Sequence, residues 1–302
     1  MSAPQTEPHE SLSAQLEAHR RLLRALVWRV TGVAADADEI VQETYLRALT
    51  KPPPDLSRCL RPWLMRVAMN LARDRLRARR RREAYPSWLP GPLLHEAPAP
   101  DALLSRAEGA NMAWMRAAEA LTPGQRAVLV LREVFELDVQ ETAQALQMSA
   151  ERVRVTHHRA RLALSSAEDA LPGAHHGPVQ RDEAEALLMR LLQAVSVGDG
   201  AALRDLLHED VVMITDGGRR FRAAGVPVVG AEKVAAVQLY FVRCSPPFVR
   251  FEAVSAADWW ARLEREPAGP RWPTSVLVGV EVRGGKIAAI YSQMVPEKLG
   301  GA

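Results

Sequence analysis

The sequence contains few of the residues that mark secreted, zinc-binding or membrane-spanning proteins. It has 302 residues and two cysteines, Cys59 and Cys244, which lie far apart in the chain. This argues against a disulfide framework or a zinc site and fits a reducing cytoplasm. No window approaches the roughly 18 to 20 apolar residues of a membrane span, and the first ten residues lack the basic and apolar parts of a secretory signal. We therefore expect a cytoplasmic protein that binds no metal and does not enter a membrane.

Acidic residues are scarce in two parts of the chain, although the formal net charge is only +3. Between Arg58 and Arg82, Asp74 is the single acid among many arginines, and a second basic cluster runs from Arg152 to Arg161. Clusters of this kind favour a polyanion such as a nucleic acid as the partner. A solvated helix face is the alternative for either cluster taken alone.

Proline-rich breaks divide the chain into parts of different periodicity. Residues 10–85 carry helical spacing, residues 86–104 form a proline-rich linker, and residues 105–170 are helical again. Residues 178–302 mix helices with strand and turn signals, such as the hairpin dipeptide Gly284-Gly285 and a proline-containing edge strand over 221–229. Residues 258–272 are assigned no element. The sequence thus predicts a multidomain protein with two all-α modules followed by an α+β domain.

The stretch from residue 61 to 82 predicts a long helix with a basic face, and Pro62 suits its first turn. Four side chains recur there at three- and four-residue spacing, which places them on one side of the helix. They are Arg66, Asn70, Arg73 and Arg77. A row of guanidinium groups with one amide is suited to phosphates and to splayed bases.

Residues 121–164 carry the signals of a helix-turn-helix. Thr122 and Pro123 open a first helix as N-cap and N1 residues, and Ser149 caps a later, basic helix after a tight turn. In this motif the second helix enters the major groove of DNA. A plain helical hairpin with a charged outer face is the alternative. The residues predicted to face DNA are Arg152, Arg154, Val155, His158 and Arg159.

Three segments carry a family resemblance: DADEIVQETYLRAL at 36–49, RPWLMRVAMNLARDRLRARRR at 61–81, and the helix-turn-helix segment at 121–164. They resemble regions 2.2, 2.3 to 2.4, and 4 of sigma-70 family RNA polymerase sigma factors of the extracytoplasmic-function type. The resemblance covers roughly residues 10 to 168 and makes residues 10–85 region 2 and residues 105–170 region 4. It implies binding to core RNA polymerase, through the clamp of its largest subunit and its flap, and to promoter DNA.

The resemblance also implies roles for individual residues. The four residues on the 61–82 helix would hold the −10 promoter element, and the five on the helix after Ser149 would read the −35 element. On the helix over 36–49, acids and an exposed aromatic side chain would contact the polymerase. These polymerase contacts are Asp38, Glu39, Gln42 and Tyr45.

Four motifs lie in the linker and beyond region 4: SWLPGPL at 87–93, DGG at 216–218, PVVGAEKV at 227–234 and VPEKL at 295–299. They are similar to motifs of the sigma-factor subgroup with a fused C-terminal SnoaL-like domain, although Gly91 stands where that subgroup has an acid. The resemblance implies an α+β cone, SnoaL-like or ketosteroid-isomerase-like, that regulates the sigma modules in place of a separate anti-sigma protein. The regulatory contacts that it implies are Trp88, Leu89, Pro90, Asp216, Gly217, Gly218, Arg219 and Arg220.

Other functions stay open from the sequence alone. A cone often encloses an apolar pocket, which could bind a small ligand or use Asp216 as a general base with His208 or Tyr240. Asp-Gly-Gly is also good turn chemistry by itself. A helix-turn-helix regulator that never joins polymerase is a further alternative. We expect a regulatory domain rather than an enzyme, and no cofactor.

Overall fold

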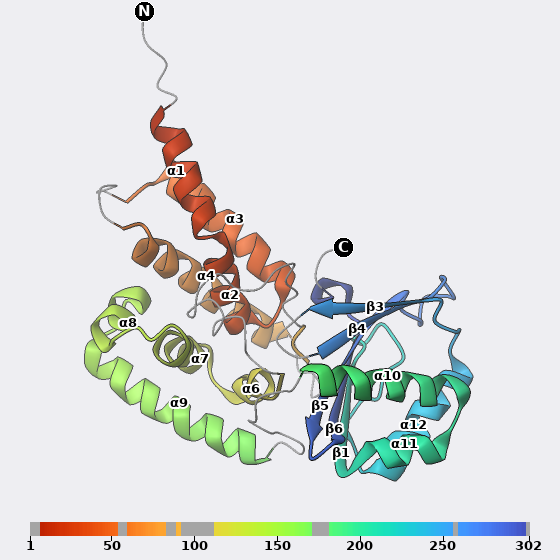
Figure 1. Ribbon diagram of the computed structural model, residues 1–302. Helices are drawn as coiled ribbons and strands as arrows, with labels where there is room; N and C mark the ends of the chain where they lie inside the picture. Colours follow the sequence, from red (N-terminus) through yellow and green to blue (C-terminus); the bar gives the residue numbers. More distant parts are fainter. Residues whose placement is uncertain are drawn as a thin grey trace, which may run out of the picture. The chain divides into compact units, whose positions relative to one another are not determined.

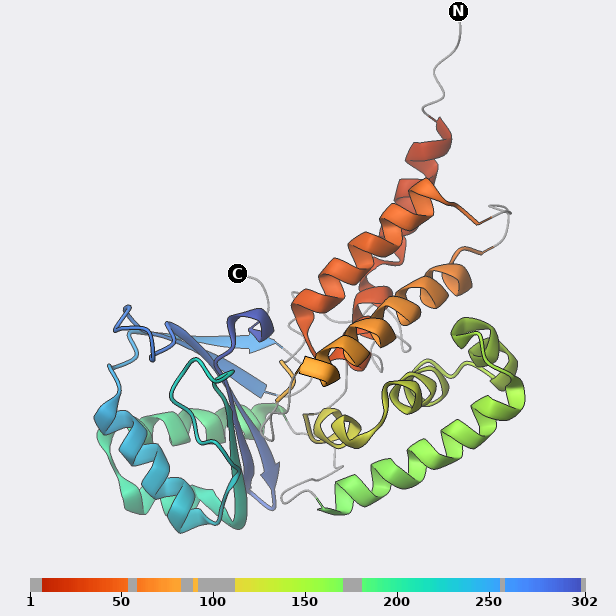
Figure 2. The same ribbon diagram turned by 180° about the vertical axis from the view of Figure 1, so that it is seen from behind.

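A computed structural model of the chain describes residues 7–53, 59–82, 89–91, 112–170, 181–255 and 259–299 (Figure 1; Figure 2). These residues form two compact units. The first contains the described residues up to 82 and those from 121 to 163, and the second contains 89–91, 112–120 and the described residues from 164 onward. The described part of the linker therefore belongs with the C-terminal domain. No helix within the described ranges is long and apolar enough to cross a membrane.

The first unit begins with four helices: α1 (Glu7–Ala18), α2 (Arg20–Thr31), α3 (Ala34–Thr50) and α4 (Arg61–Arg82). Helix α2 packs against both α3 and α4. Its apolar residues Leu23, Leu26, Val27 and Val30 are buried, as their helical spacing predicts. Helix α2 ends where Gly32 adopts a left-handed conformation with φ 70°, which glycine accepts without a steric penalty.

The rest of the first unit contains the predicted helix-turn-helix. Its elements are α7 (Pro123–Leu129), the π-helical turn η2 (Val130–Val134), α8 (Val139–Leu146) and α9 (Ala150–Ala170), of which residues 150–163 belong to this unit. Thr122 and Asp138 each form a capping box, at the start of α7 and of α8. Ser149 Oγ accepts a hydrogen bond from the N–H of Arg152 at 3.2 Å and so begins α9. The predicted motif and its caps are confirmed.

The second unit combines helices with one six-stranded sheet. Its helices are α6 (Met112–Ala117), η1 (Ala118–Ala120), α10 (Arg181–Val197), α11 (Gly200–Leu206), α12 (Ala231–Cys244) and η3 (Pro296–Lys298). Its strands are β1 (Leu207–Asp216), β2 (Val228–Val229), β3 (Arg250–Ser255), β4 (Trp259–Glu264), β5 (Ser275–Arg283) and β6 (Lys286–Gln293). The strand order is β2-β1-β6-β5-β4-β3, with β1 and β6 parallel and every other pair antiparallel.

One apolar core joins the helices of the second unit to its sheet. Helices α10, α11 and α12 gather on one side of the sheet (Figure 1), and α10 and α12 contact its strands. Leu188, Leu203 and Val234 from these helices share the core with Val280 and Ile290 from the strands. This arrangement is the predicted α+β cone.

The structure corrects two details of the predicted sheet. The edge strand expected over 221–229 is only the two-residue β2, and β4 lies in the segment 258–272, for which no strand was predicted. Strand β4 pairs with β3 on one side and β5 on the other, and Trp260 and Ala261 are both buried. The strand nevertheless alternates beyond Trp260, because buried Ala261 and Leu263 alternate with half-buried Arg262 and Glu264, so an available signal was missed. The predicted hairpin turn is confirmed, since Gly284 and Gly285 have φ values of 56° and 74°.

Candidate nucleic-acid interface and linker site

Helix α4 carries the predicted −10 residues, and α8 packs against this helix. Arg73 Nη1 donates to the backbone oxygen of Leu146, the last residue of α8, at 3.3 Å, and lies 3.5 Å from Asn70 Oδ1. Burial, followed by the charge of Arg77, lowers the pKa of Arg73. Arg66, Asn70 and Arg73 are half-buried, whereas Arg77 is exposed. The four residues share a helix as predicted, but Arg73 is engaged by the second helical module.

Helix α9 presents the predicted −35 residues to solvent. Val153 and Ala160 on its inner side are fully buried and anchor the helix. Val155 on the outer side is 44% exposed, and an apolar side chain among arginines suits contact with a thymine methyl group. The exposed set comprises all five predicted residues: Arg152, Arg154, Val155, His158 and Arg159.

Helix α3 carries the predicted polymerase contacts, and its acids are paired within the first unit. Asp38 Oδ1 accepts a hydrogen bond from Arg24 Nε at 2.7 Å, and Glu39 Oε2 accepts one from Arg75 Nη2 at 2.7 Å. Gln42 is exposed. Exposed ion pairs of this kind contribute little to stability, about 0 to 1 kcal/mol, so a partner can displace them at a small cost.

Tyr45 is half-buried rather than exposed as expected. Its hydroxyl donates to the backbone oxygen of Leu16 in α1, and the Arg20 guanidinium lies 5.6 Å from its ring centroid. Burial, followed by the charge of Glu17, raises the pKa of Tyr45 to about 12. The end of α1 covers this ring, which sequence spacing within α3 could not reveal.

Leu89 of the linker is held by three side chains of the C-terminal domain. Its N–H donates to Asp216 Oδ2 at 3.1 Å, and its carbonyl oxygen accepts from Gln293 Nε2 at 2.8 Å and Lys298 Nζ at 3.0 Å. Asp216 ends β1 and Gln293 ends β6, where the two residues are paired in register, and Lys298 ends η3. We term Leu89, Asp216, Gln293 and Lys298 the linker clamp.

The linker clamp contains a buried ion pair. Lys298 Nζ lies 2.7 Å from Asp216 Oδ2, and the two side chains are 8% and 2% exposed. Asp216 Oδ1 also accepts the N–H of Gly218 at 3.0 Å. Buried charges are tolerated when they are paired and hydrogen-bonded, and this carboxylate satisfies both conditions partly through the backbone of Leu89. Docking of the linker therefore supplies hydrogen bonds to both members of the buried ion pair.

The linker also approaches the C-terminal domain closely at Gly91. A Cβ atom at this position would lie 2.1 Å from the carbonyl oxygen of Lys298, which leaves no space for any side chain. The glycine that replaces the expected acid thus has a steric reason in this chain. Leu89, Pro90 and Gly91 are all buried, and Trp88, the other predicted anchor, lies outside the described residues.

The Asp-Gly-Gly segment after β1 forms the predicted turn. Gly217 is buried, and a Cβ atom there would lie 2.7 Å from the carbonyl oxygen of Phe221. Arg219 is exposed with φ 61°. Arg220 Nη2 lies 2.8 Å from Glu297 Oε1 in an exposed ion pair. The side chain of Arg220 therefore has its partner inside the C-terminal domain.

A second contact in this unit involves Arg116 of α6, which sequence reasoning missed. Its guanidinium lies 5.5 Å from the ring centroid of Tyr291, and its Nη1 donates to the Tyr291 hydroxyl at 3.4 Å. That hydroxyl donates to Glu281 Oε1 at 2.9 Å. Burial, followed by the charge of Glu281, raises the pKa of Tyr291. The segment that leads into the helix-turn-helix is thus attached to β6.

The general-base hypothesis for Asp216 is wrong in its geometry. The second unit contains a cavity of about 520 Å³ that is open to solvent, and Asp216, His208 and Tyr240 are not among its lining residues. Asp216 is engaged by the linker, His208 Nδ1 lies 2.6 Å from Arg283 Nη2, and Tyr240 is 59% exposed. Within the described ranges, no group of three or more His, Cys, Asp or Glu side chains is placed to hold a metal ion.

Family models for sigma-70 region 2 and sigma-70 region 4 match residues 16–82 and 111–164. These ranges contain the α4 face and the helix-turn-helix described above. The second match begins before α6, so it includes the segment that Arg116 attaches to the C-terminal domain.

The similarity to known proteins extends over the whole chain. The ECF RNA polymerase sigma factor SigJ of Mycobacterium tuberculosis is 32% identical over 299 residues, which cover 96% of this chain and 93% of the relative. The probable ECF RNA polymerase sigma factor SigI of the same species is 28% identical, with 96% of each chain covered. The crystal structure of M. tuberculosis SigJ is similar with a TM-score of 0.71 and 28% identity over 95% of this chain and 97% of that chain. The chain therefore belongs to the extracytoplasmic-function sigma factors of the sigma-70 family, which bind core RNA polymerase and promoter DNA.

Proposed function

We propose that the C-terminal domain of this sigma factor holds the sigma modules in a closed resting form, in place of a separate anti-sigma protein. The observation that carries the proposal is the linker clamp, because it binds the backbone of Leu89 through a buried ion pair. Backbone hydrogen bonds to a charged pair hold a position on the chain irrespective of the linker's own side chains. The clamp therefore acts on the connection between regions 2 and 4.

The geometry of a promoter supports a closed form that cannot read DNA. The −10 and −35 elements lie about 25 base pairs apart, or roughly 85 Å at about 3.4 Å per base pair. In the first unit, α4 and α8 are in direct contact through Arg73 and the backbone of Leu146. A protein that reads both elements must separate these helices. The contact is consequently a feature of a resting form.

Two attachments of the chain support restraint by the C-terminal domain. The linker clamp holds Leu89, and Tyr291 holds Arg116, which precedes the N-cap Thr122 of α7 by only a few residues. The segment that precedes the helix-turn-helix in the chain is thus bound to the C-terminal domain through Arg116. A tether of this length raises the effective concentration of weakly interacting modules to roughly the millimolar range, so the contact between α4 and α8 can be weak and still form.

Release of the linker would then expose the surfaces that sigma activity requires. On this proposal, the polymerase clamp is bound by residues of α3, namely Asp38, Glu39, Gln42 and Tyr45, and region 4 binds the flap. The basic face of α4 holds the −10 element and the outer face of α9 reads the −35 element. The exposure of Gln42 and of the α9 face supports these roles.

A side chain added at Gly91 tests the proposal, because it should displace the linker while Asp216 and Lys298 keep their charges. Gly91→Ala places a Cβ atom against the Lys298 carbonyl and should displace the linker, whereas Gly225→Ala in the same domain meets no atom within 4 Å and serves as the control. We expect Gly91→Ala to bind core polymerase more tightly and to give more transcript in vitro than the wild type or the control. Equal polymerase affinity and equal transcript for all three proteins would contradict restraint by the clamp.

A further inference from the structure

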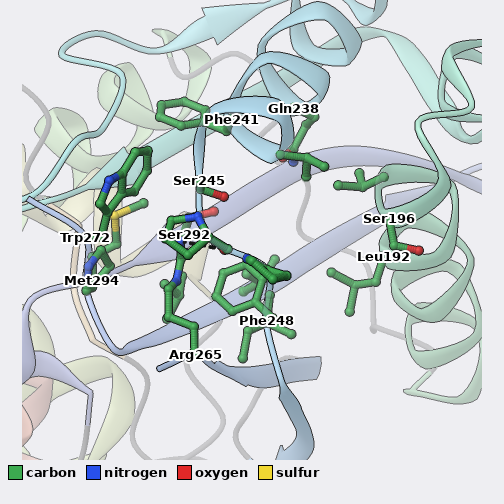
Figure 3. Close-up of a pocket in the computed structure, with 18 of the residues that line it drawn as sticks. Leu192, Ser196, Gln238, Phe241, Ser245, Phe248, Arg265, Trp272, Ser292 and Met294 are labelled. Atoms are coloured by element: carbon green, nitrogen blue, oxygen red, sulfur yellow. Dashed lines mark hydrogen bonds between the residues drawn. The ribbon is translucent and has the colours of Figure 1, made fainter. Parts of the chain in front are cut away.

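The cavity of the C-terminal domain is large enough for a small organic molecule. Its volume of about 520 Å³ falls within the range of roughly 300 to 1,000 Å³ that is typical of ligand pockets. Figure 3 shows Leu192 and Ser196 of α10 on one side and Trp272 and Met294 on the other. The lining is mostly aliphatic and aromatic, with Phe241 and Val278 among its members. Such walls favour the apolar part of a ligand.

The charged groups in the lining all have one sign. Arg222, Arg250 and Arg265 line the cavity, and none of the described aspartates and glutamates does. Arg250 lies 3.7 Å from the carboxylate of Glu264, and its side chain is 68% exposed. Arg222 is exposed, with its guanidinium 5.3 Å from the ring centroid of Trp272. The excess of positive charge favours an anionic group on the ligand.

Arg265 is the buried member of this group. The residue is 8% exposed, and its guanidinium lies 4.0 Å from the ring centroid of Phe248 and 5.7 Å from that of Trp272. Its Nη1 donates to the backbone oxygen of Pro246 at 3.2 Å, whereas Nε is buried with no hydrogen-bond partner. Among the described residues, no carboxylate lies within ion-pair distance of Arg265. Burial lowers the pKa of this arginine.

A buried arginine in this state selects one kind of ligand group. Nη1 of Arg265 already donates to Pro246, so Nε and Nη2 are the remaining donors. They lie on one edge of the guanidinium plane and form a fork. A carboxylate matches such a fork with two parallel hydrogen bonds and supplies the missing negative charge. A neutral hydroxyl could satisfy one donor but would leave the buried charge uncompensated.

We propose that this cavity binds an amphipathic carboxylate, with its carboxylate on Arg265 and its apolar part along Leu192 and Phe241. The proposal goes beyond control by the linker and does not depend on the linker clamp. Arg265 and Trp272 both come from the segment 258–272, which carries no family motif. The specificity of the site would therefore belong to this chain rather than to the cone fold in general.

Calorimetric titration of the full chain tests the proposal with three probes that share a twelve-carbon tail. We expect dodecanoate to bind below its micelle concentration, dodecanol to bind about tenfold more weakly, and dodecyltrimethylammonium not to bind. Arg265→Met should weaken dodecanoate binding about tenfold, a difference of about 1.4 kcal/mol, while leaving dodecanol binding unchanged. Arg243→Met is the matched control, because Arg243 is exposed and does not line the cavity.

The outcomes separate the site from non-specific binding. Equal affinity for dodecanoate and dodecanol, or unchanged dodecanoate binding by Arg265→Met, would overturn the anion site. Failure of all three probes to bind would overturn the ligand site altogether. If Arg265→Met does not fold, Leu192→Trp fills the cavity from α10 and should abolish dodecanoate binding; retained binding would place the ligand elsewhere and overturn the proposal. None of these results depends on core polymerase, so the resting-form proposal can fail separately.

Discussion

The ion pair of the linker clamp allows a quantitative test of how the linker is held. Lys298→Met removes the ammonium but keeps a side chain of similar length, and Asp216→Asn removes the carboxylate charge but keeps an oxygen that can accept the Leu89 N–H. Each single change leaves one buried charge without its partner, since both side chains are at most 8% exposed. Loss of one partner of such a pair typically costs about 3–5 kcal/mol. The double variant removes both charges, so no buried charge is left without a partner.

We therefore expect strong coupling between the two changes. Each single variant should destabilise the closed clamp by about 3 kcal/mol or more, whereas the double variant should lose less than the sum of the two. At about 1.4 kcal/mol per tenfold, 3 kcal/mol raises the population of released linker by more than a hundredfold. Little of this effect should depend on salt, because a buried pair is screened much less than an exposed one.

Amide hydrogen exchange is the suitable assay, because it reports local opening rather than the unfolding of a multidomain chain. The N–H of Leu89 is donated to Asp216 and is protected only while the clamp is closed. Its exchange should be fast in both single variants and slower in the double variant. Additive effects on the exchange of this amide would refute the view that the ion pair holds the linker.

Three further predictions concern the sigma modules. Arg73→Ala removes the hydrogen bond to the Leu146 carbonyl, so amides of α8 should exchange faster; unchanged exchange would mean that this bond does not hold α8. Arg154→Ala should lower promoter affinity by about 1–3 kcal/mol and relax base preference at one −35 position in a promoter-library selection; a uniform loss for all sequences would indicate a phosphate contact instead. Tyr45→Phe removes the hydrogen bond to Leu16 and should lower stability by about 1 kcal/mol in thermal unfolding at pH 8. The folded pKa of Tyr45, about 12, lies above its ordinary value of 10, so the wild type loses this contribution as pH rises from 10 to 12 and the two proteins should converge; a constant difference would contradict the assignment.

Local chemistry explains why most of the first unit could be predicted from sequence. Thr122 and Ser149 are recognisable caps because their partners lie within a few residues. The exposed face of α9 follows from helical spacing in the same way. The exposure of Tyr45 was misjudged because the group that its hydroxyl contacts, the carbonyl of Leu16, comes from another helix. Spacing within one helix carries no information about such a neighbour.

The contacts of the linker in the second unit could not be predicted from local sequence patterns. The spacing of residues does not indicate that Leu89 meets Asp216 and Lys298, since these contacts join positions more than a hundred residues apart. The family resemblance indicated Leu89 and Asp216 as regulatory contacts but gave no chemistry for them. It missed Lys298 and Arg116, although the VPEKL motif contains Lys298. A lysine within an otherwise apolar and turn-forming motif was the available signal.

The strands β1 and β6 connect the linker clamp to the cavity. Thr215 and Ser292 are paired in register and line the cavity, and the next pair, Asp216 and Gln293, holds Leu89. Successive side chains of a strand point to opposite faces, so a single layer of backbone separates the ligand site from the linker. Packed strands cannot move Thr215 without moving Asp216. A ligand that fits the cavity better when the clamp is closed would stabilise the resting form, and closure would tighten ligand binding by the same factor. Under that condition, the two proposed sites would be linked in free energy although their chemistry is separate.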